Sequence, residues 1–425
     1  MVTMPSSALK LNIGFVSTRF AGTDGVSLET EKWAEVLGEF GHHCFYFAGE
    51  CDREPEISMV MPEAQYRHPE IEERQTHFFG NEKRSREDTD WIHETTKFLK
   101  QKLYTFKEEF NIEVLIPENS LAIPLHIPLG LAITEFIAET NIPTIAHHHD
   151  FSWERKRFLV NNVWDYLSMA FPPTLHSIQH VTINSSGRHQ LARRKGVVST
   201  IIPNVMQFEK PSPGIDDYNQ DLRKALGISK DQLFVLQPTR VVQRKGIEHA
   251  IELLSRLGMD AVLVISHASG DEGYEYEQRL RKYANVMNVP TIFASELFDD
   301  KRSLTPDGKK VYSLWDAYPH ADLVTYPSLI EGFGNAFLEA VYFKKPIVVN
   351  NYTIYNIDIR TKAFKVIEFD DYITEETIET TRYVLEHPDE VARMVDHNYD
   401  LALKYYSYHV LRARLKVLLD NLVWD

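Results

Sequence analysis

The segment DLVTYPSLIEGFGNAFLEA, residues 322–340, decides the fold class of this chain. Its apolar run predicts a buried strand, the glycines that follow predict a loop, and NAFLEA opens a helical pattern. Strand, loop and helix in this order form the repeating unit of a doubly wound sheet. The segment therefore predicts an α/β fold.

Two carboxylates in this segment are candidate site residues. Glu331 lies in the loop, and Glu339 follows eight positions later in the helix, slightly over two turns away. Gly332 and Gly334 would let backbone N–H groups approach a ligand, and a helix N-terminus favours phosphates and sugar hydroxyls. The alternative is a surface helix with two solvated glutamates. The preceding strand and the glycines favour a ligand site.

A second motif, QPTRVVQRKG at residues 237–246, carries two candidate cations. Arg240 and Lys245 lie between the end of a predicted strand and the start of a helix. Ligands of α/β sheets bind at the carboxyl ends of strands, and two cations there suit a diphosphate. The alternative is a solvated basic turn, and Arg244 is the cation in this motif that we expect to be solvated.

The same alternation of strands and helices extends outward over the chain. In the second half, strands are predicted at 234–238, 261–266, 291–294, 323–326, 347–350 and 363–367, with helices at 222–226 and 246–257. In the first half, strands are predicted at 11–17, 42–48, 112–116, 143–146, 181–184 and 200–202, with helices ending at Phe40 and spanning 121–139.

The length of 425 residues suits two α/β domains of roughly 200 residues each. Residues 1–207 form the first predicted domain and 208–400 the second, with a linker-like stretch, PSPGIDDY, at 211–218. Residues 389–423 are predicted to be helical, and the part from 401 to 425 could pack back onto the first domain.

Composition excludes several classes of protein. The formal net charge is −15 and the basic residues are scattered, so nucleic acid is not an expected partner. Cys44 and Cys51 form neither a disulfide framework nor a zinc pattern, which favours a reducing compartment. The N-terminus MVTMPSSALK is not apolar, and no apolar run reaches about 18 residues. We expect a soluble cytoplasmic protein without membrane insertion.

Residues 51–90 interrupt the regular alternation. They are charged, rich in glutamate and broken by prolines, and NEKRSRED within them resembles a mobile loop. A helix with aromatic and leucine side chains on one side is predicted to follow, over residues 91–110. Long charged insertions in α/β domains are often lids or acceptor-binding loops. A solvated insertion is the alternative.

The arginine, lysine and paired glutamates of the second half resemble those of retaining family 4 glycosyltransferases. That family includes sucrose-phosphate synthases, sucrose synthases and enzymes that make mannosyl- or glucosyl-glycerate compounds. The resemblance implies the GT-B fold, in which two Rossmann-like domains face each other across a cleft and a C-terminal helix crosses back. It also implies that the donor binds mainly to the second domain and the acceptor to the first.

The resemblance carries roles to individual residues. Arg240 and Lys245 would bracket the donor diphosphate, Glu331 would approach the donor sugar, and Glu339 would bind the ribose hydroxyls. Backbone contacts to the donor would come from Gly332, Phe333, Gly334 and Asn335.

In the first domain the family has a glycine-containing loop after the first strand. GTDGVS at residues 22–27 occupies that place, with Gly25 a candidate donor contact and Asp24 a candidate acceptor contact. This loop lacks the double glycine common among the sucrose enzymes.

The family also carries a histidine that touches the donor sugar, and the run His147–Asp150 (HHHD) lies at that place. Alternation along an extended chain would turn His147 and His149 to one side and His148 to the other. We favour His147 for the sugar contact, followed by His149, which is also a candidate acceptor contact. Two alternatives stay open, a metal site and three structural histidines, although no other motif in the sequence completes a metal site.

An anionic acceptor would need a local positive pocket in this acidic protein. In sucrose-phosphate synthases, arginines in comparable stretches hold the acceptor phosphate, which makes Arg155, Arg157 and Arg188 candidates. Lys156 lies between the first two, on what is predicted to be the first turn of a helix. Solvated charges are the alternative.

Together these features predict a hexosyltransferase that retains the anomeric configuration. Our leading reading is transfer of glucose from UDP-glucose to fructose 6-phosphate, with a glycerate or glucosylglycerate acceptor as the alternative. A phosphorylase or epimerase of the same fold, and a non-enzymatic sugar-binding protein, are further alternatives. No cofactor or metal is expected, because Arg240 and Lys245 would stabilise the leaving diphosphate. No oligomeric state is predicted.

Overall fold

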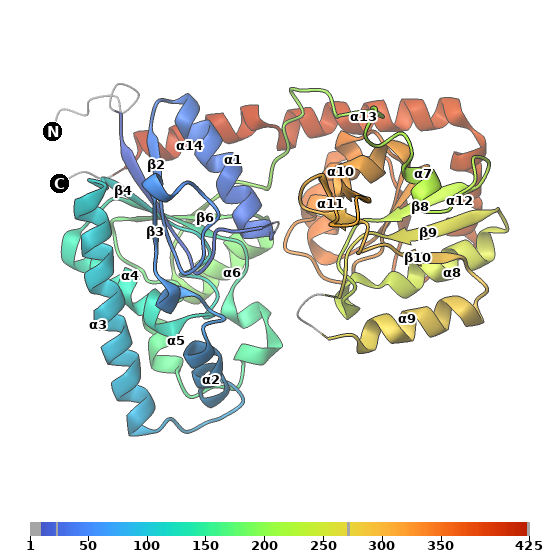
Figure 1. Cartoon of the computed structure of the whole chain (residues 1–425). Helices are drawn as coiled ribbons and strands as arrows, with labels where there is room; N and C mark the ends of the chain where they lie inside the picture. The colour runs from blue at the N-terminus through green and yellow to red at the C-terminus, as the bar shows by residue number, and fades with distance from the viewer. Residues whose placement is uncertain (1–9, 23, 270–272, 423–425) are drawn as a thin grey trace. The chain divides into compact units, whose positions relative to one another are not determined.

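The computed structural model describes residues 10–22, 24–269 and 273–422. They form two compact units, which are Met1–Val205 with Tyr408–Asp425, and Met206–Ser407 (Figure 1). The N-terminal stretch that we read as lacking a targeting segment lies largely outside the described residues. Within the described ranges, no helix combines the length and the apolar character that crossing a bilayer requires.

The first unit contains a parallel seven-stranded sheet with strand order β3-β2-β1-β4-β5-β6-β7. Its strands are β1 (Asn12–Val16), β2 (His43–Ala48), β3 (Ser58–Val60), β4 (Val114–Pro117), β5 (Thr144–His148), β6 (Ile178–Thr182) and β7 (Ser199–Ile201). Its helices are α1 (Gly25–Glu39), α2 (Pro69–Phe78), α3 (Arg86–Glu109), α4 (Ile127–Thr140), α5 (Trp164–Ala170), α6 (Ser185–Lys195) and α14 (Tyr408–Asp420).

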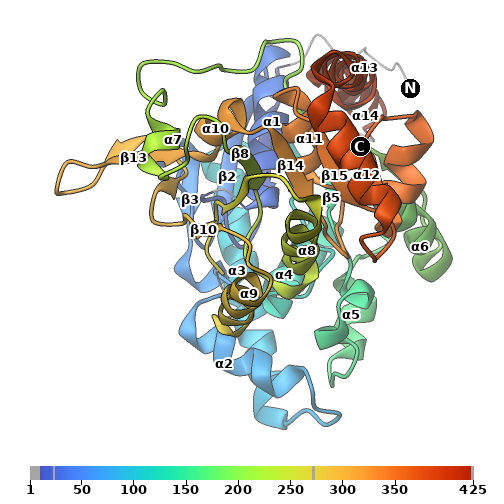
Figure 2. The same ribbon diagram turned by 90° about the vertical axis from the view of Figure 1, so that its right-hand side faces the viewer.

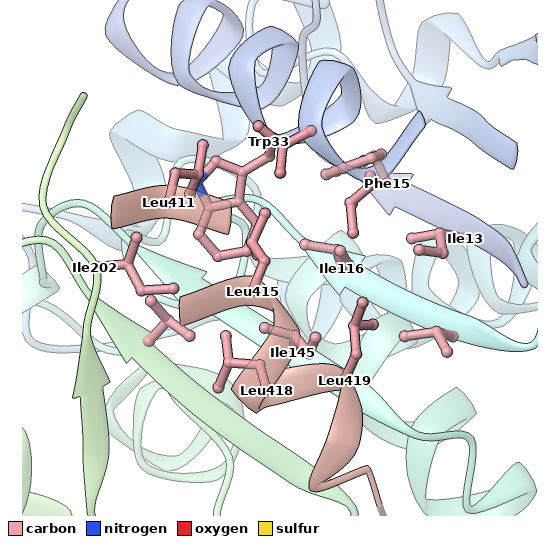
Figure 3. Packing of buried hydrophobic residues seen from close by; sticks show 14 of the residues in the cluster. Ile13, Phe15, Trp33, Ile116, Ile145, Ile202, Leu411, Leu415, Leu418 and Leu419 are labelled. Atoms are coloured by element: carbon pink, nitrogen blue, oxygen red, sulfur yellow. The ribbon is translucent and has the colours of Figure 1, made fainter. Parts of the chain in front are cut away.

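Helices cover both faces of this sheet. Successive side chains along a strand point to opposite faces, so each strand contributes to two cores. Ile13 and Phe15 of β1 pack on one face with Trp33 of α1, and Val16 packs on the other with α3 and α4. Figure 3 shows Leu411 and the other leucines of α14 among the residues of the first face. The C-terminal helix therefore completes the core of the first unit.

The second unit contains a parallel six-stranded sheet with strand order β10-β9-β8-β14-β15-β16. Figure 2 labels β8, β10, β14 and β15 of this sheet. Its strands are β8 (Leu233–Gln237), β9 (Ala261–Ile265), β10 (Thr291–Phe293), β14 (Leu323–Tyr326), β15 (Ile347–Asn350) and β16 (Ile367–Phe369). Strands β11 (Phe298–Asp299), β12 (Ser303–Leu304) and β13 (Lys310–Ser313) form a separate small sheet. Its helices are α7 (Leu222–Ala225), α8 (Ile247–Leu257), α9 (Glu275–Val286), α10 (Leu314–Ala317), α11 (Asn335–Tyr342), α12 (Glu375–Glu386) and α13 (Pro388–Tyr406).

The two parallel sheets with flanking helices confirm the predicted α/β class. Residues 51–90, the C-terminal segment and the last strand are among the segments that differ from prediction. Residues 51–90 are not one loop, because they contain β3 at the sheet edge and α2. The C-terminal segment is two helices, with the buried Ser407 between α13 and α14. The last strand, β16, begins four residues after the left-handed Ala363, which ends the preceding turn.

The strand order of each sheet reverses once. The reversal lies between β1 and β4 in the first unit and between β8 and β14 in the second. Open α/β sheets bind ligands beyond the carboxyl ends of the strands at such a reversal. The loops after these four strands are therefore the places where functional side chains are expected.

Candidate functional site

In the second unit, both predicted motifs lie at the reversal of the sheet. Strand β14 pairs directly with β8, so the loops that follow them are neighbours. The amide of Leu329 donates to the carbonyl of Arg244 at 2.8 Å, which joins the two loops. Gly246 has φ of +57°, and a Cβ at this position would lie 2.5 Å from the carbonyl oxygen of Pro327. Glycine is therefore needed where the loops meet.

Three charged side chains meet between these loops. The Lys245 ammonium is hydrogen-bonded to Glu331 Oε1, and Arg244 Nη1 lies 3.5 Å from Glu331 Oε2. The side chains of Lys245 and Glu331 are only 11% and 10% exposed. Lys245 also lies 5.6 Å from the ring centre of Tyr326, the last residue of β14. A lysine and a glutamate 86 positions apart thus form one buried ion pair.

Burial and charge act in opposite directions on this pair. Burial disfavours the charged form of Glu331, but the Lys245 and Arg244 charges outweigh it and lower the pKa of Glu331. Burial lowers the pKa of Lys245, and Glu331 offsets part of that effect. Removing either partner would leave the other charge buried and poorly compensated.

One of the two arginines of the basic motif does not lie as predicted. Arg244, which we expected to be solvated, is 27% exposed and lies beside Glu331. Arg240 is exposed. Its positive charge still reaches His267, because burial lowers the pKa of that histidine to about 4 and the charges of Arg240 and Lys245 act in the same direction. The expectation for Arg244 was wrong because the loop after β14 folds over it, which local sequence does not reveal.

The helix N-terminus after Glu331 is built around a strained glycine. Gly334 caps α11 with φ of +133°, and a Cβ there would lie 2.5 Å from the Tyr352 hydroxyl. That hydroxyl donates to the carbonyl of Phe333 at 2.7 Å. Gly332 is exposed and Asn335 is the first residue of the helix. The backbone amides of this turn are thus held at the start of α11.

Glu339 lies within α11, after the turn that begins the helix. It is partly buried, and its Oε2 accepts a hydrogen bond from Tyr318 at 2.7 Å. Tyr318 is itself fully buried. The tyrosine therefore orients the carboxylate that the family resemblance assigns to the ribose.

In the first unit, the loop after β1 leads into α1. Asp24 caps this helix, because its side chain accepts from the amides of Val26 and Ser27 at 3.0 and 3.1 Å and from the Ser27 hydroxyl at 2.7 Å. Gly25 is the exposed first residue of the helix. The structure thus gives Asp24 a capping role, beside the acceptor contact that the sequence predicts.

The histidine run spans the end of β5 and follows the predicted alternation. His147 and His149 turn to one side, where Glu118 after β4 lies 2.9 Å from His147 Nδ1 and 3.4 Å from His149 Nε2. His148 turns to the other side and shares a hydrogen bond of 2.9 Å with His180 on β6. His147 has no exposed surface and stacks on Trp33 at 4.2 Å, whereas the His149 side chain is 10% exposed.

Burial controls the ionisation of this cluster. It raises the pKa of Glu118 to about 7 and lowers the pKa of His147 to about 3. Burial also lowers the pKa of His149, and a positive charge on His147 would lower the pKa of His149 further. At neutral pH both imidazoles are therefore neutral.

The predicted acceptor arginines lie on the surface of the first unit. Arg155 is bonded to Asp150 through Nε and Nη2, each at 2.6 Å. Residues Ser152–Glu154 and Lys156–Phe158 form single 3-10 turns, so the helix predicted at Lys156 is not present. Arg157 lies 4.6 Å from the ring centre of Phe158, and Arg188 is exposed in the first turns of α6.

Sequence reasoning missed Glu118 and its neighbour Asn119. Asn119 has φ of +55°, its side chain accepts from the amide of His149 at 3.0 Å, and it donates to Asp150 at 2.9 Å. A signal was present, because two polar residues directly follow a buried strand of the sheet. Only the strand order, which puts β4 beside β5, reveals that they meet the histidines.

Comparison with solved structures identifies the fold. A glycosyltransferase from Rickettsia africae aligns over 97% of this chain and 98% of its own, with a TM-score of 0.69 and 13% identity. Sucrose-phosphate synthase of Thermosynechococcus elongatus aligns over 96% and 98%, with a TM-score of 0.66 and 14% identity. The protein has the GT-B fold of glycosyltransferases.

Comparison with curated proteins identifies the family. Mannosylglucosylglycerate synthase of Thermotoga maritima is 30% identical over 93% of this chain and 97% of its own length. The enzyme of the same name from Petrotoga mobilis is 33% identical over 84% of this chain and 86% of its own. No family model matches. This chain belongs to the mannosylglucosylglycerate synthase family and is a hexosyltransferase.

Proposed function

We propose that this protein transfers a mannosyl group, with retention, from a nucleoside diphosphate to a glucosylglycerate-type acceptor. The observation that carries glycosyl transfer is the Lys245–Glu331 pair at the sheet reversal of the second unit. The names of the relatives support a mannosyl donor and a glycerate-containing acceptor. They favour our alternative reading over fructose 6-phosphate, which the sequence had suggested first.

In this proposal the donor diphosphate lies at the loop after β8, near Arg240 and Lys245. The bond between the anomeric carbon and the diphosphate oxygen breaks while the acceptor hydroxyl attacks from the same face. The hydroxyl proton passes to the departing phosphate oxygen, so retention needs no enzymic nucleophile. The two cations stabilise the leaving charge, and a preorganised donor of this kind is typically worth about 3 kcal/mol. We propose that this step needs no metal ion at the diphosphate.

The buried Glu331 would hold Lys245 in place and face the donor sugar. Glu339, oriented by Tyr318, would accept hydrogen bonds from the ribose hydroxyls. Of the histidines, His149 fits a sugar contact better than His147, because it keeps some exposed surface.

The acceptor carboxylate would need a cation in the first unit. Arg155 is already bonded to Asp150 and Arg157 lies over the ring of Phe158, so Arg188 is the better candidate among the predicted arginines. Planar guanidinium groups suit carboxylates and phosphates equally.

A donor and acceptor panel tests this proposal. Purified protein is mixed with UDP-glucose or with mannose activated by several nucleoside diphosphates, and with glucosylglycerate or fructose 6-phosphate. Release of nucleoside diphosphate and the anomeric configuration by NMR are measured. We expect an α-mannosyl product from an α-linked donor with glucosylglycerate. Faster turnover with UDP-glucose and fructose 6-phosphate, or an inverted product, would contradict it.

A phosphorylated acceptor is the second candidate. Mannosylglucosyl-3-phosphoglycerate synthase of Petrotoga mobilis is 31% identical over half of this chain and 42% of its own length. Glucosyl-3-phosphoglycerate therefore belongs in the same panel. Because the two relatives that match most of the chain act on the unphosphorylated series by name, we expect the lower KM for glucosylglycerate. Replacing Arg188 by alanine should raise the acceptor KM and leave the donor KM unchanged.

A further inference from the structure

Three side chains of the first unit converge on one point beyond the carboxyl ends of β4 and β5. Glu118 follows β4, His147 lies in β5 and His149 follows it. One nitrogen from each imidazole and one carboxylate oxygen lie within 4.8 Å of one another. This cluster lies at the reversal of the first sheet. The proposed function uses only His149 of its members, as a contact to the donor sugar, and gives Glu118 and His147 no role.

The cluster is almost closed to solvent and its polar atoms are not satisfied. Glu118 and His147 are fully buried, and the His149 side chain is 10% exposed. Glu118 Oε1, His147 Nε2 and His149 Nε2 are buried and have no hydrogen-bond partner. Buried polar atoms nearly always have partners, and exceptions indicate an ion or water at the site. Of these atoms, Glu118 Oε1 and His149 Nε2 would be satisfied by a ligand bound between the two side chains, whereas the His147 nitrogen that faces Glu118 is Nδ1.

The donor set and the spacing fit a transition metal ion. Two imidazoles and one carboxylate are a ligand set of zinc sites that keep a fourth position open. Tetrahedral ligands bound at about 2.1 Å lie about 3.4 Å from one another. Glu118 Oε2 lies 2.9 Å from His147 Nδ1 and 3.4 Å from His149 Nε2, and the ligand atoms of the three residues all lie within 4.8 Å of one another. Rotation of the side chains would bring them to that spacing.

The surroundings hold the ligands in position. Trp33 stacks on the His147 ring at 4.2 Å, which limits its rotation. The Asn119 side chain accepts from the backbone amide of His149 at 3.0 Å and fixes the strand end that carries it.

We propose that Glu118, His147 and His149 bind one divalent transition metal ion, with Zn²⁺ the best fit. The sequence had left a metal site open for the histidine run, but no third ligand was visible. Glu118 supplies it, 29 positions before His147. The ion would join the ends of β4 and β5, whether or not the substrates are those proposed above.

Metal analysis of the full-length protein tests the proposal. The protein is purified without a histidine tag, dialysed against metal-free buffer after incubation with Zn²⁺, and analysed by inductively coupled plasma mass spectrometry. We expect about one equivalent per chain, and a rise of the thermal midpoint when Zn²⁺ is added to chelator-treated protein. Glu118→Gln and His149→Ala should each reduce metal affinity at least 10-fold. His176→Ala, which removes an exposed histidine of the same unit, should bind normally.

Co²⁺ supplies a second readout that needs no variant. Bound at this site, it should show the intense visible absorption of four-coordinate cobalt. Less than about 0.1 equivalent of Zn²⁺ with an unchanged thermal midpoint would overturn the proposal. Full binding in folded Glu118→Gln and His149→Ala proteins, checked by circular dichroism, would also overturn it. Should those variants unfold, the absence of the cobalt spectrum in the wild type would be decisive against the site.

Discussion

Lys245 and Arg240 belong to the same motif but differ in their surroundings. Lys245 is buried against Glu331, whereas Arg240 is exposed. Comparing variants of the two residues therefore separates the effect of a lost cation on turnover from its effect on the stability of the fold.

Lys245→Ala and Arg240→Ala should each lower kcat by roughly 100-fold, because each removes a cation from the leaving diphosphate. Only Lys245→Ala should also lower the free energy of unfolding, by about 3 kcal/mol, because it leaves Glu331 buried with Arg244 alone. Steady-state kinetics and urea unfolding measure the two effects. Lys309→Ala, at an exposed lysine, serves as the control. Normal turnover in both motif variants would remove the diphosphate assignment.

The two glutamates of the second motif should differ in what they bind. Glu331→Gln should impair turnover and leave affinity for the nucleoside diphosphate nearly unchanged, because this product lacks the sugar. Glu339→Gln should weaken that affinity by roughly 10-fold or more, since a hydrogen bond to a charged group is worth about 1.5–3 kcal/mol. Isothermal titration calorimetry with the nucleoside diphosphate decides between the roles. Equal losses of affinity would contradict this division.

At the scale of the element, α11 depends on the conformation of one residue before it. Gly334→Ala places a Cβ in a left-handed conformation and 2.5 Å from the Tyr352 hydroxyl. We expect a loss of about 1–3 kcal/mol in the free energy of unfolding, together with reduced turnover. Gly214→Ala is the matched control, because an added Cβ there meets no heavy atom within 4 Å. Similar stability of the two variants in urea would show that α11 tolerates the change.

Helix α4 has a titratable cap. His126 accepts the Leu129 amide through Nδ1 at 3.1 Å and donates through Nε2 to the carbonyl of Glu63 at 2.8 Å, so the folded protein holds it neutral. Burial lowers its pKa to about 4, and the carbonyl of Glu63 offsets part of that effect.

The depressed pKa of His126 makes stability depend on pH. Between its folded value of about 4 and the unfolded value of about 6.5, the unfolded chain binds more protons, so the free energy of unfolding falls as pH falls. One such group contributes up to about 1.4 kcal/mol per pH unit. His126→Asn keeps a capping acceptor and should reduce this slope between pH 6.5 and 5, measured by urea unfolding. The same slope as in the exposed-site control His176→Asn would contradict the assignment.

At the scale of the whole molecule, the end of the chain completes the core at its beginning. Leu415 of α14 is fully buried in the cluster that contains Ile13 and Trp33 (Figure 3). Arg412 on the same helix is bonded to Glu39 of α1. The core of the first unit is therefore incomplete without α14.

Leu415→Ala should lower the free energy of unfolding of the first unit by about 2–5 kcal/mol, because it leaves a cavity in this core. Val417→Ala changes a residue of the same helix that is 55% exposed and should alter stability by less than about 0.5 kcal/mol. Fluorescence of Trp33 and its neighbours during urea unfolding follows this unit. Equal effects of the two substitutions would show that α14 is not part of the core.

Local sequence patterns were sufficient to predict most strands of the two large sheets. Short apolar runs between glycine or proline signals predicted β1, β8, β9, β14 and β15 to within one or two residues. The small sheet of β11, β12 and β13 was missed because its strands have two to four residues and little apolar character. The edge strand β3 was missed because it has only three residues.

The sequence by itself determined the α/β class, the two motifs at the carboxyl ends of β8 and β14, and the side to which each histidine of the run turns. These properties depend on periodicity and spacing along a few residues. Only the tertiary structure decided that Arg244 lies beside Glu331 while Arg240 is exposed, that Arg155 is bonded to Asp150, and that Glu118 meets His147 and His149. Strand order and loop packing bring these partners together. Both depend on contacts between residues far apart in the sequence, so the residues adjacent to each partner do not reveal them.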